Sequence, residues 1–112
     1  MAEPDGGALD PEDAKIVTLA RSSRARTGAA EGAAVRDTTG RTYVATSVEL
    51  PSLKLTALQA AVAAAVSSGA DGLEAAAVVT EAGTVDATAA RDLTAGVPVL
   101  RADPSGAVVE TL

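Results

Sequence analysis

Carboxylates are the side chains of this chain that could carry acid–base or metal chemistry, because the sequence contains neither histidine nor cysteine. Zinc sites built from thiolate or imidazole groups, and nucleophiles activated by histidine, are therefore excluded. Carboxylates can still bind Mg²⁺ or work as an acid–base pair. The acidic residues in predicted loops and at predicted strand ends are Glu31, Asp37, Glu49, Asp71, Glu74, Glu81, Asp86 and Asp103. They show no DxD-like clustering, so we expect dispersed, solvated surface charges.

The charge and the glycine pattern give no sign of a phosphate or nucleic-acid site. The net charge is −6, and residues 28–32 lack both the lysine of a P-loop and the spacing of a dinucleotide-binding loop. A protein that binds nucleic acid needs clustered lysines and arginines to neutralise phosphates. We therefore expect no nucleic-acid partner.

Sequence features of export and of membrane insertion are also lacking. The chain has no cysteine for disulfides, no basic segment followed by an apolar leader, and no apolar run of about 20 residues. We therefore expect a cytoplasmic protein with no membrane partner.

The elements that position these residues begin with a helix, at the start of a single domain predicted over residues 10–112. Residues 1–9 combine proline, glycine and acidic residues with little to bury, and we expect them to form a disordered tail. Asp10 as N-cap and Pro11 at the first helical position predict a helix that runs to about Arg26. Its predicted apolar stripe consists of Ile16, Leu19, Ala20 and Ser23.

Four further segments have the patterns of β-strands, and two of them form a hairpin. Residues 32–37 and 41–48 flank a short polar connection that carries a glycine, which is typical of an antiparallel hairpin. The continuous apolar run in residues 73–80 indicates a central strand covered on both faces. Residues 97–102 and 107–111 are two more strands, separated by a turn sequence.

Two more helices complete the predicted fold. Pro51 and Ser52 are predicted to open a helix that ends before Gly69, and a short helix is expected over residues 86–94. The apolar positions of the longer helix recur at spacings of three and four residues and are Leu55, Leu58, Val62, Ala65 and Val66. The order helix, hairpin, helix, strand, helix, strand, strand predicts an α/β fold of three layers, α/β/α, around a mixed five-stranded sheet.

Several segments resemble the small zinc-dependent cytidine deaminases. GAAVRDTTGRTYVATSVE (residues 32–49) and LTALQAAVAAAVSSGA (residues 55–70) are similar to the family's GAAVxxxDGxxxxGxNVEN and LCAERxAxxxAVxxG. TAARDL (residues 88–93), followed by residues 96–99 and 103–106, is similar to the family's PCGxCRQxL, its TPV strand and its DxxG hairpin. The resemblance extends over about residues 12–112 and implies the cytidine deaminase fold.

The positions that correspond to the family's catalytic groups carry other residues here. In the family, a metal-binding Cys or His, a proton-shuttling glutamate two residues later, and the two cysteines of PCxxC allow zinc to form hydroxide near neutral pH. Thr56 takes the place of the first ligand and Leu58 that of the glutamate. Ala87 and Ala90 take the places of the two cysteines. We therefore expect no catalytic residue, no bound metal and no cofactor.

The ribose-contacting end of the family's NVEN strand is retained in part. Here it reads Ser47-Val48-Glu49-Leu50. The resemblance makes Glu49 and Ser47 candidate ligand contacts. The alternative is that Glu49 is a surface carboxylate that precedes a loop.

Three functional interpretations stay open. The leading one is a catalytically inactive cytidine deaminase-like protein that acts by self-assembly, as a homodimer or tetramer, or by binding a protein partner. The alternative is a non-catalytic sensor of nucleosides or nucleotides. The third is an enzyme, either one that uses carboxylate or magnesium chemistry or a residual cytidine deaminase, the activity that homology alone implies. A polar cavity beside Glu49 and Thr56 would favour sensing, whereas a core closed by Leu58 would favour assembly.

Overall fold

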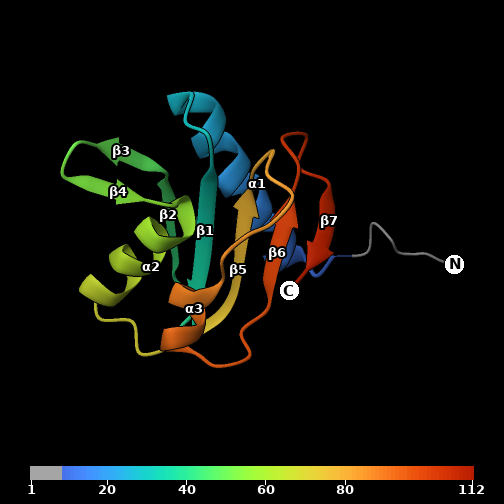
Figure 1. The fold of residues 1–112 in the computed structure, drawn as a ribbon. Helices are drawn as coiled ribbons and strands as arrows, with labels where there is room; N and C mark the ends of the chain where they lie inside the picture. The colour runs from blue at the N-terminus through green and yellow to red at the C-terminus, as the bar shows by residue number, and fades with distance from the viewer. Residues whose placement is uncertain (1–8) are drawn as a thin grey trace, which may run out of the picture.

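The computed structural model describes residues 9–112 (Figure 1). The predicted disordered tail lies outside the described residues except for Leu9, which is partly buried against the apolar cluster beneath the first helix. None of the helices in the described range is both long and apolar enough to cross a membrane.

Helix α1 spans Pro11–Thr27 and begins where the sequence predicts. The Asp10 side chain caps it by accepting a hydrogen bond from the amide of Glu12 at 2.8 Å. Gly28 ends the helix in the left-handed conformation, with φ of 71°, which glycine adopts without a Cβ clash. The residues that α1 buries are Ile16, Val17, Ala20 and Ser23. Leu19 was predicted in this stripe but is only partly buried, because the side of the helix with Val17 faces the sheet.

The main sheet has five strands and mixed strand directions, as predicted. Its strands are β1 (Gly32–Asp37), β2 (Thr42–Thr46), β5 (Leu73–Val79), β6 (Val99–Ala102) and β7 (Val108–Thr111). They lie in the order β2-β1-β5-β6-β7, with β5 and β6 parallel and the other neighbours antiparallel. The central strand β5 is buried at every position except Glu74, in agreement with the apolar residues 75–79, which show no polar alternation.

Helices cover both faces of the sheet, which gives the predicted three layers (Figure 1). Helix α1 packs on one face over Ala34, Ala77 and Leu100. On the other face lie α2 (Ala57–Ser67) and α3 (Thr88–Leu93), packed over Val35 and Val78. Both clusters are rich in alanine, so each helix approaches the sheet closely, and each side chain contributes less burial than leucine would.

The segment before α2 differs from the prediction. Instead of opening a helix, Pro51 and Ser52 form the turn of a small hairpin between β3 (Val48–Leu50) and β4 (Leu53–Leu55). Helix α2 begins only at Ala57, because Thr56 and Gln59 form a capping box at that point. The predicted short helix over residues 86–94 is likewise confined to α3.

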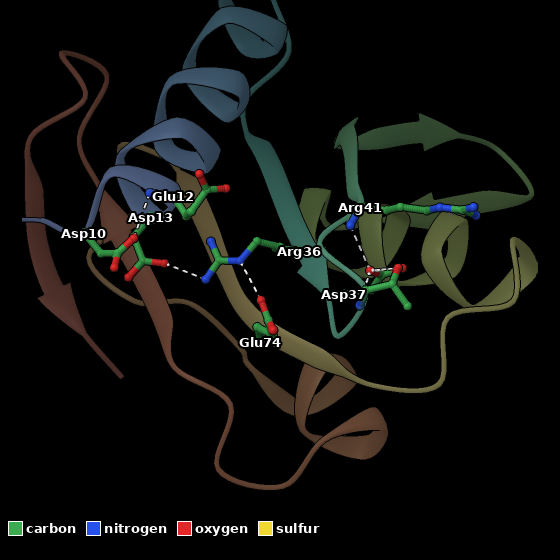
Figure 2. Close-up of polar contacts among 8 residues, drawn as sticks. Asp10, Glu12, Asp13, Arg36, Asp37, Arg41 and Glu74 are labelled. Atoms are coloured by element: carbon green, nitrogen blue, oxygen red, sulfur yellow. Dashed lines mark hydrogen bonds and ion pairs between the residues drawn. The ribbon is translucent and has the colours of Figure 1, made fainter.

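Two neighbouring charged residues of β1 serve opposite faces of the sheet (Figure 2). Arg36 donates from Nε to Glu74 at 2.9 Å and from Nη2 to Asp13 at 3.0 Å, which connects β1 with β5 and α1. Asp37 accepts from the Thr39 hydroxyl at 2.7 Å and from the Arg41 amide at 2.9 Å. The hydrogen bond from the Thr39 hydroxyl is the main reason that the pKa of Asp37 lies below its ordinary value. Arg36 therefore connects α1 with the sheet, and Asp37 stabilises the turn between β1 and β2.

Candidate functional site

A cleft of about 510 Å³ opens beside the start of α2. One wall is the β3–β4 hairpin, and the opposite wall comes from the residues that follow α1 and β5. Its polar and charged lining residues are Arg24, Glu31, Ser47, Glu49, Lys54, Thr56, Gln59, Thr80 and Glu81. The cleft contains no aromatic residue, since the chain's single aromatic side chain, Tyr43, is not among its lining residues.

At the α2 end of the cleft, the backbone amides that begin the helix already have hydrogen-bond partners within the chain. The Thr56 hydroxyl accepts from the Gln59 amide at 3.1 Å, and Gln59 Oε1 accepts from the Thr56 amide at 2.9 Å. Glu31 Oε1 lies 3.5 Å from the amide nitrogen of Ala57, from which it accepts a third, longer hydrogen bond. Three of the amides that a helix start leaves without a helical partner are thus satisfied internally.

Leu58, Ala87 and Ala90 come together in one apolar cluster, although Ala87 lies 29 positions after Leu58 in the sequence. Leu58 is 1% exposed, Ala90 is 0% exposed, and Ala87 is 8% exposed. Val35 and Val99 belong to the same cluster. The positions that the resemblance assigns to the glutamate and the two cysteines are therefore neighbours in the fold and are filled by hydrocarbon.

Thr56 lies outside this cluster, on the wall of the cleft. Its hydroxyl is engaged in capping α2. Ala87 precedes α3 and gives that helix no side-chain cap; instead the Asp86 carboxylate accepts from the hydroxyl and the amide of Thr88, at 2.6 Å and 2.9 Å. The hydrogen bond from the Thr88 hydroxyl is the largest reason that the pKa of Asp86 is below its ordinary value.

The four positions do not fit a zinc ion. Zinc in proteins takes thiolate, imidazole or carboxylate ligands, and here three of the four side chains are hydrocarbon. A displaced ligand set would leave a buried polar atom without a partner near the cluster. In residues 9–112, the one buried side-chain nitrogen or oxygen without a partner is Arg36 Nη1, on the α1 face of the sheet. The same residues contain no group of three or more acidic side chains able to hold a metal ion.

The structure brings both candidate ligand contacts to the cleft. Ser47 follows β2 and is held by Glu31, the residue before β1, since its hydroxyl accepts from the Glu31 amide at 3.3 Å and its amide donates to the Glu31 carbonyl at 3.1 Å. Glu49 lies in β3 opposite Lys54 and is exposed. Glu49 therefore presents its carboxylate to the cleft and to solvent at once.

The cleft also contains charged residues that sequence reasoning did not connect with it. Glu31 and Glu81 were expected to be dispersed surface charges, yet both line the cleft together with Glu49. Arg24 lies 3.9 Å from Glu81 and donates to the carbonyl of Ala30 at 3.0 Å. Antiparallel pairing of β1 with β5 places Gly32 opposite Val79, so the residue before β1 and the residues after β5 meet at one edge of the sheet. The sequence can assign Glu31 and Glu81 to one site only once the pairing of β1 with β5 is known.

The mixed sheet, with α1 on one face and α2 and α3 on the other, makes this a three-layer α/β/α domain. The starts of α2 and α3 meet at the apolar cluster that contains Leu58 and Ala87. A model of the family described as cytidine deaminase-like matches residues 9–106, and the chain therefore belongs to the cytidine deaminase-like family.

Solved structures have the same fold. The crystal structure of cytidine deaminase from Burkholderia pseudomallei is 22% identical, with a TM-score of 0.72 over 88% of this chain and 89% of that chain. The crystal structure of cytidine deaminase from Mycobacterium leprae is 19% identical, with a TM-score of 0.68 over 91% of this chain and 94% of that chain. A search of curated protein sequences gives no significant match. At these identities the likeness concerns the fold.

Proposed function

We propose that this protein is a non-catalytic member of the cytidine deaminase-like family that acts by self-assembly or by binding a protein partner. The observation that carries the proposal is the burial of Leu58, Ala87 and Ala90 in one apolar cluster. These are the positions that the resemblance assigns to the proton-shuttling glutamate and to two of the zinc ligands.

Deamination by the family's chemistry needs a metal-activated hydroxide and a group that moves a proton to the leaving ammonia. Leu58 has no proton to transfer, and two methyl groups cannot coordinate a metal. Thr56 retains an oxygen, but that oxygen already accepts the Gln59 amide hydrogen bond that begins α2. Each role in the reaction therefore lacks its group.

An assay of cytidine turnover tests the proposal. The protein should release no uridine above buffer, in the presence or absence of added zinc, while a zinc-containing cytidine deaminase assayed in parallel should do so. Turnover that rises in proportion to the protein concentration, and that stays with the protein through two different columns, would contradict the proposal.

Self-assembly is supported by apolar surface on the outer layer. Val66 of α2 is 50% exposed, and it lies in a shallow, mostly apolar groove of about 450 Å³ between α2 and α3. Burial of such a surface in a partner adds to the small gain from an alanine-rich core. We expect a homodimer or tetramer by light scattering at tens of micromolar protein, and a monomer at that concentration would contradict self-assembly. A cytoplasmic location and the absence of a nucleic-acid partner stay predictions.

The cleft favours a second candidate function, the sensing of a nucleoside or nucleotide. Its volume suits a small molecule, and Ser47 and Glu49 keep the places that contact ribose in the family that the chain resembles.

A ligand that binds only the folded state raises the melting temperature. If the cleft is a sensor, a pyrimidine nucleoside should stabilise the wild type, Glu49→Gln should lose the effect, and Asp71→Asn, an exposed carboxylate outside the cleft, should keep it. If no nucleoside in a panel shifts the melting temperature, sensing is wrong.

A further inference from the structure

We propose that two copies of this chain pair along the free edge of β2, antiparallel and around a twofold axis at Val44, so that their two sheets become continuous. The inference rests on the self-assembly proposed above and names the surface through which the copies meet. The pairing also brings Arg41 of each copy to the cleft of the other.

Strand β2 presents an unpaired row of backbone groups at its outer edge. In residues 9–112 it pairs with β1 alone, because β3 and β4 form a separate sheet. The Arg41 carbonyl accepts from the Asp37 amide at 2.8 Å, and the Ser47 amide donates to the Glu31 carbonyl at 3.1 Å. Because hydrogen-bonded pairs alternate along an antiparallel ladder, the odd-numbered residues of β2 bond to β1. The residues whose amides and carbonyls point outward are Thr42, Val44 and Thr46.

This edge lacks the features that keep edge strands from pairing, which are charges, prolines and bulges. The sequence of β2, TYVAT, contains neither a charge nor a proline, and its register with β1 is unbroken. The opposite edge strand, β7, carries Glu110 in an ion pair with Arg101, and its register with β6 is shifted at one point. The protein therefore protects one edge of the sheet and leaves the other open to a partner strand.

The outward-facing residues determine the register of the twofold pair. With Val44 opposite Val44 of the second copy, Thr42 lies opposite Thr46, and each outward amide and carbonyl of these residues gains a partner. A shift by two residues would leave Thr42 or Thr46 without a strand partner. Since β2 has no charged residue, self-pairing places no like charges opposite each other. The edge is thus complementary to itself, which favours a second copy as its occupant.

The side of α2 above this edge consists of small residues. Val62 and Val66 line the groove on the α3 side of the helix. The helical period places Ala60 and Ala64 on the other side, away from α3. Since α2 packs mainly over β2 and β1, that side faces the free edge. The α2 helices of two paired copies can therefore approach closely, without large side chains between them.

The free cation Arg41 lies where this register places it beside the second copy's cleft. Arg41 is exposed and forms no ion pair within residues 9–112, and Figure 2 shows its side chain extending away from Asp37. Tyr43 and Ala45 pack on the α2 side of the sheet, so alternation places Arg41 and Ser47 on that side too. In the paired sheet, Arg41 of one copy lies opposite Ser47 of the other, on the cleft wall.

The cleft has an excess of negative charge to receive this cation. Its charged lining residues are Glu31, Glu49, Glu81, Arg24 and Lys54, so carboxylates outnumber cations. Side chains directly opposite each other in a sheet have Cβ atoms about 5 Å apart, which is within the reach of an arginine. Arg41 of the second copy therefore matches the cleft in charge as well as in position.

Sedimentation and light scattering measure the association, with the fold of each variant checked by circular dichroism. Val44→Lys places like charges opposite each other at the axis and should weaken the dimer at least about tenfold. The control Val109→Lys makes the same change at an exposed valine of β7 and should leave the dimer unchanged. Arg41→Ala should weaken it several-fold, whereas Arg91→Ala, which removes an exposed cation of α3, should not.

Cysteine crosslinking tests the register, because the wild type contains no cysteine. Opposite residues of a hydrogen-bonded pair have Cα atoms about 5.5 Å apart, which suits a disulfide. Val44→Cys alone should form a disulfide-linked dimer under mild oxidation. Thr42→Cys alone should not, but a mixture of Thr42→Cys and Thr46→Cys proteins should.

Two outcomes would overturn the edge pairing while self-assembly stands. One is a dimer that Val44→Lys does not weaken, and the other is a Val44→Cys dimer that crosslinks no faster than a Val109→Cys control. A wild-type protein that stays monomeric would overturn both the edge pairing and the self-assembly on which it rests.

Discussion

The cleft and the apolar cluster meet at the first turn of α2, and they differ in what fills them. On the cleft side, Thr56 and Gln59 face an open volume that contains five charged side chains. On the cluster side, Ala57 and Leu58 are buried among alanines and valines of the sheet and of α3. The resemblance assigns candidate ligand contacts, Ser47 and Glu49, to the cleft side, and it assigns the family's proton-shuttling glutamate, at Leu58, to the cluster side. In this chain the cleft side is open, whereas the cluster side is occupied by the chain's own hydrocarbon side chains. Substitutions on the two sides should therefore have very different effects on stability.

Replacement of Leu58 by glutamate should have the largest effect. The new carboxylate would be buried without a partner, and we expect a loss on the order of 4 kcal/mol of unfolding free energy, or failure to fold. Urea unfolding measures it. The matched variant Leu58→Met keeps the volume and should cost less than about 1.5 kcal/mol. A Leu58→Glu protein as stable as the wild type would mean that the cluster opens to water, and the contrast with the cleft would disappear.

Removal of the Asp37 carboxylate should have a smaller effect that depends on pH. Its pKa is lowered in the folded protein, so its contribution is present above the unfolded pKa, about 3.9 for aspartate. That contribution is lost as the pH falls through the lower folded pKa. In denaturant unfolding, Asp37→Ala should be clearly less stable than the wild type at pH 7, and the difference should shrink below about pH 4. Asp71→Ala serves as the control. An equal difference at all pH values would assign the effect to the altered turn and not to the charge.

Removal of the Thr56 hydroxyl tests the boundary between the two regions. Thr56→Ala loses the cap that begins α2, and we expect a cost of about 1 kcal/mol in unfolding free energy. Thr56→Ser retains the oxygen and should stay within a few tenths of the wild type. If Thr56→Ala were neutral, the capping box would contribute nothing, and the hydroxyl would be available for another role in the cleft.

Substitution of Glu49 should have the smallest effect. Glu49→Gln lies on the open side and is exposed, so the unfolding free energy should change by less than about 0.5 kcal/mol. A large loss would mean that Glu49 holds the hairpin in place, and the cleft would be a structural feature of the fold.

The sequence predicted the order of the elements well because each carries a local signal. Asp10 and Pro11 mark the start of α1, and the apolar run of residues 75–79 marks the central strand. The β3–β4 hairpin was missed because Leu55, two residues after Leu53, also extends the apolar spacing of the helix that follows, and because Pro51 and Ser52 fit a helix start. The alternation of the two leucines, which fits a strand, extends over too few residues to outweigh that spacing.

The candidate site was predictable only in part. The resemblance led to Leu58, Ala87 and Ala90, and the fold brings them together because α2 and α3 pack on the same face of the sheet. It also led to Ser47 and Glu49. The contributions of Arg24, Glu31 and Glu81 to the cleft depend on which strands pair, and tertiary pairing has no local signature in the sequence.

Zinc content is the most direct test of whether the family's metal position is filled by the chain. The protein should be purified in the presence of zinc, dialysed against metal-free buffer, and measured by elemental analysis together with a zinc-containing cytidine deaminase treated in the same way. We predict that the control keeps its metal and that this protein retains no stoichiometric zinc. About one zinc per chain, retained through dialysis, would contradict the account.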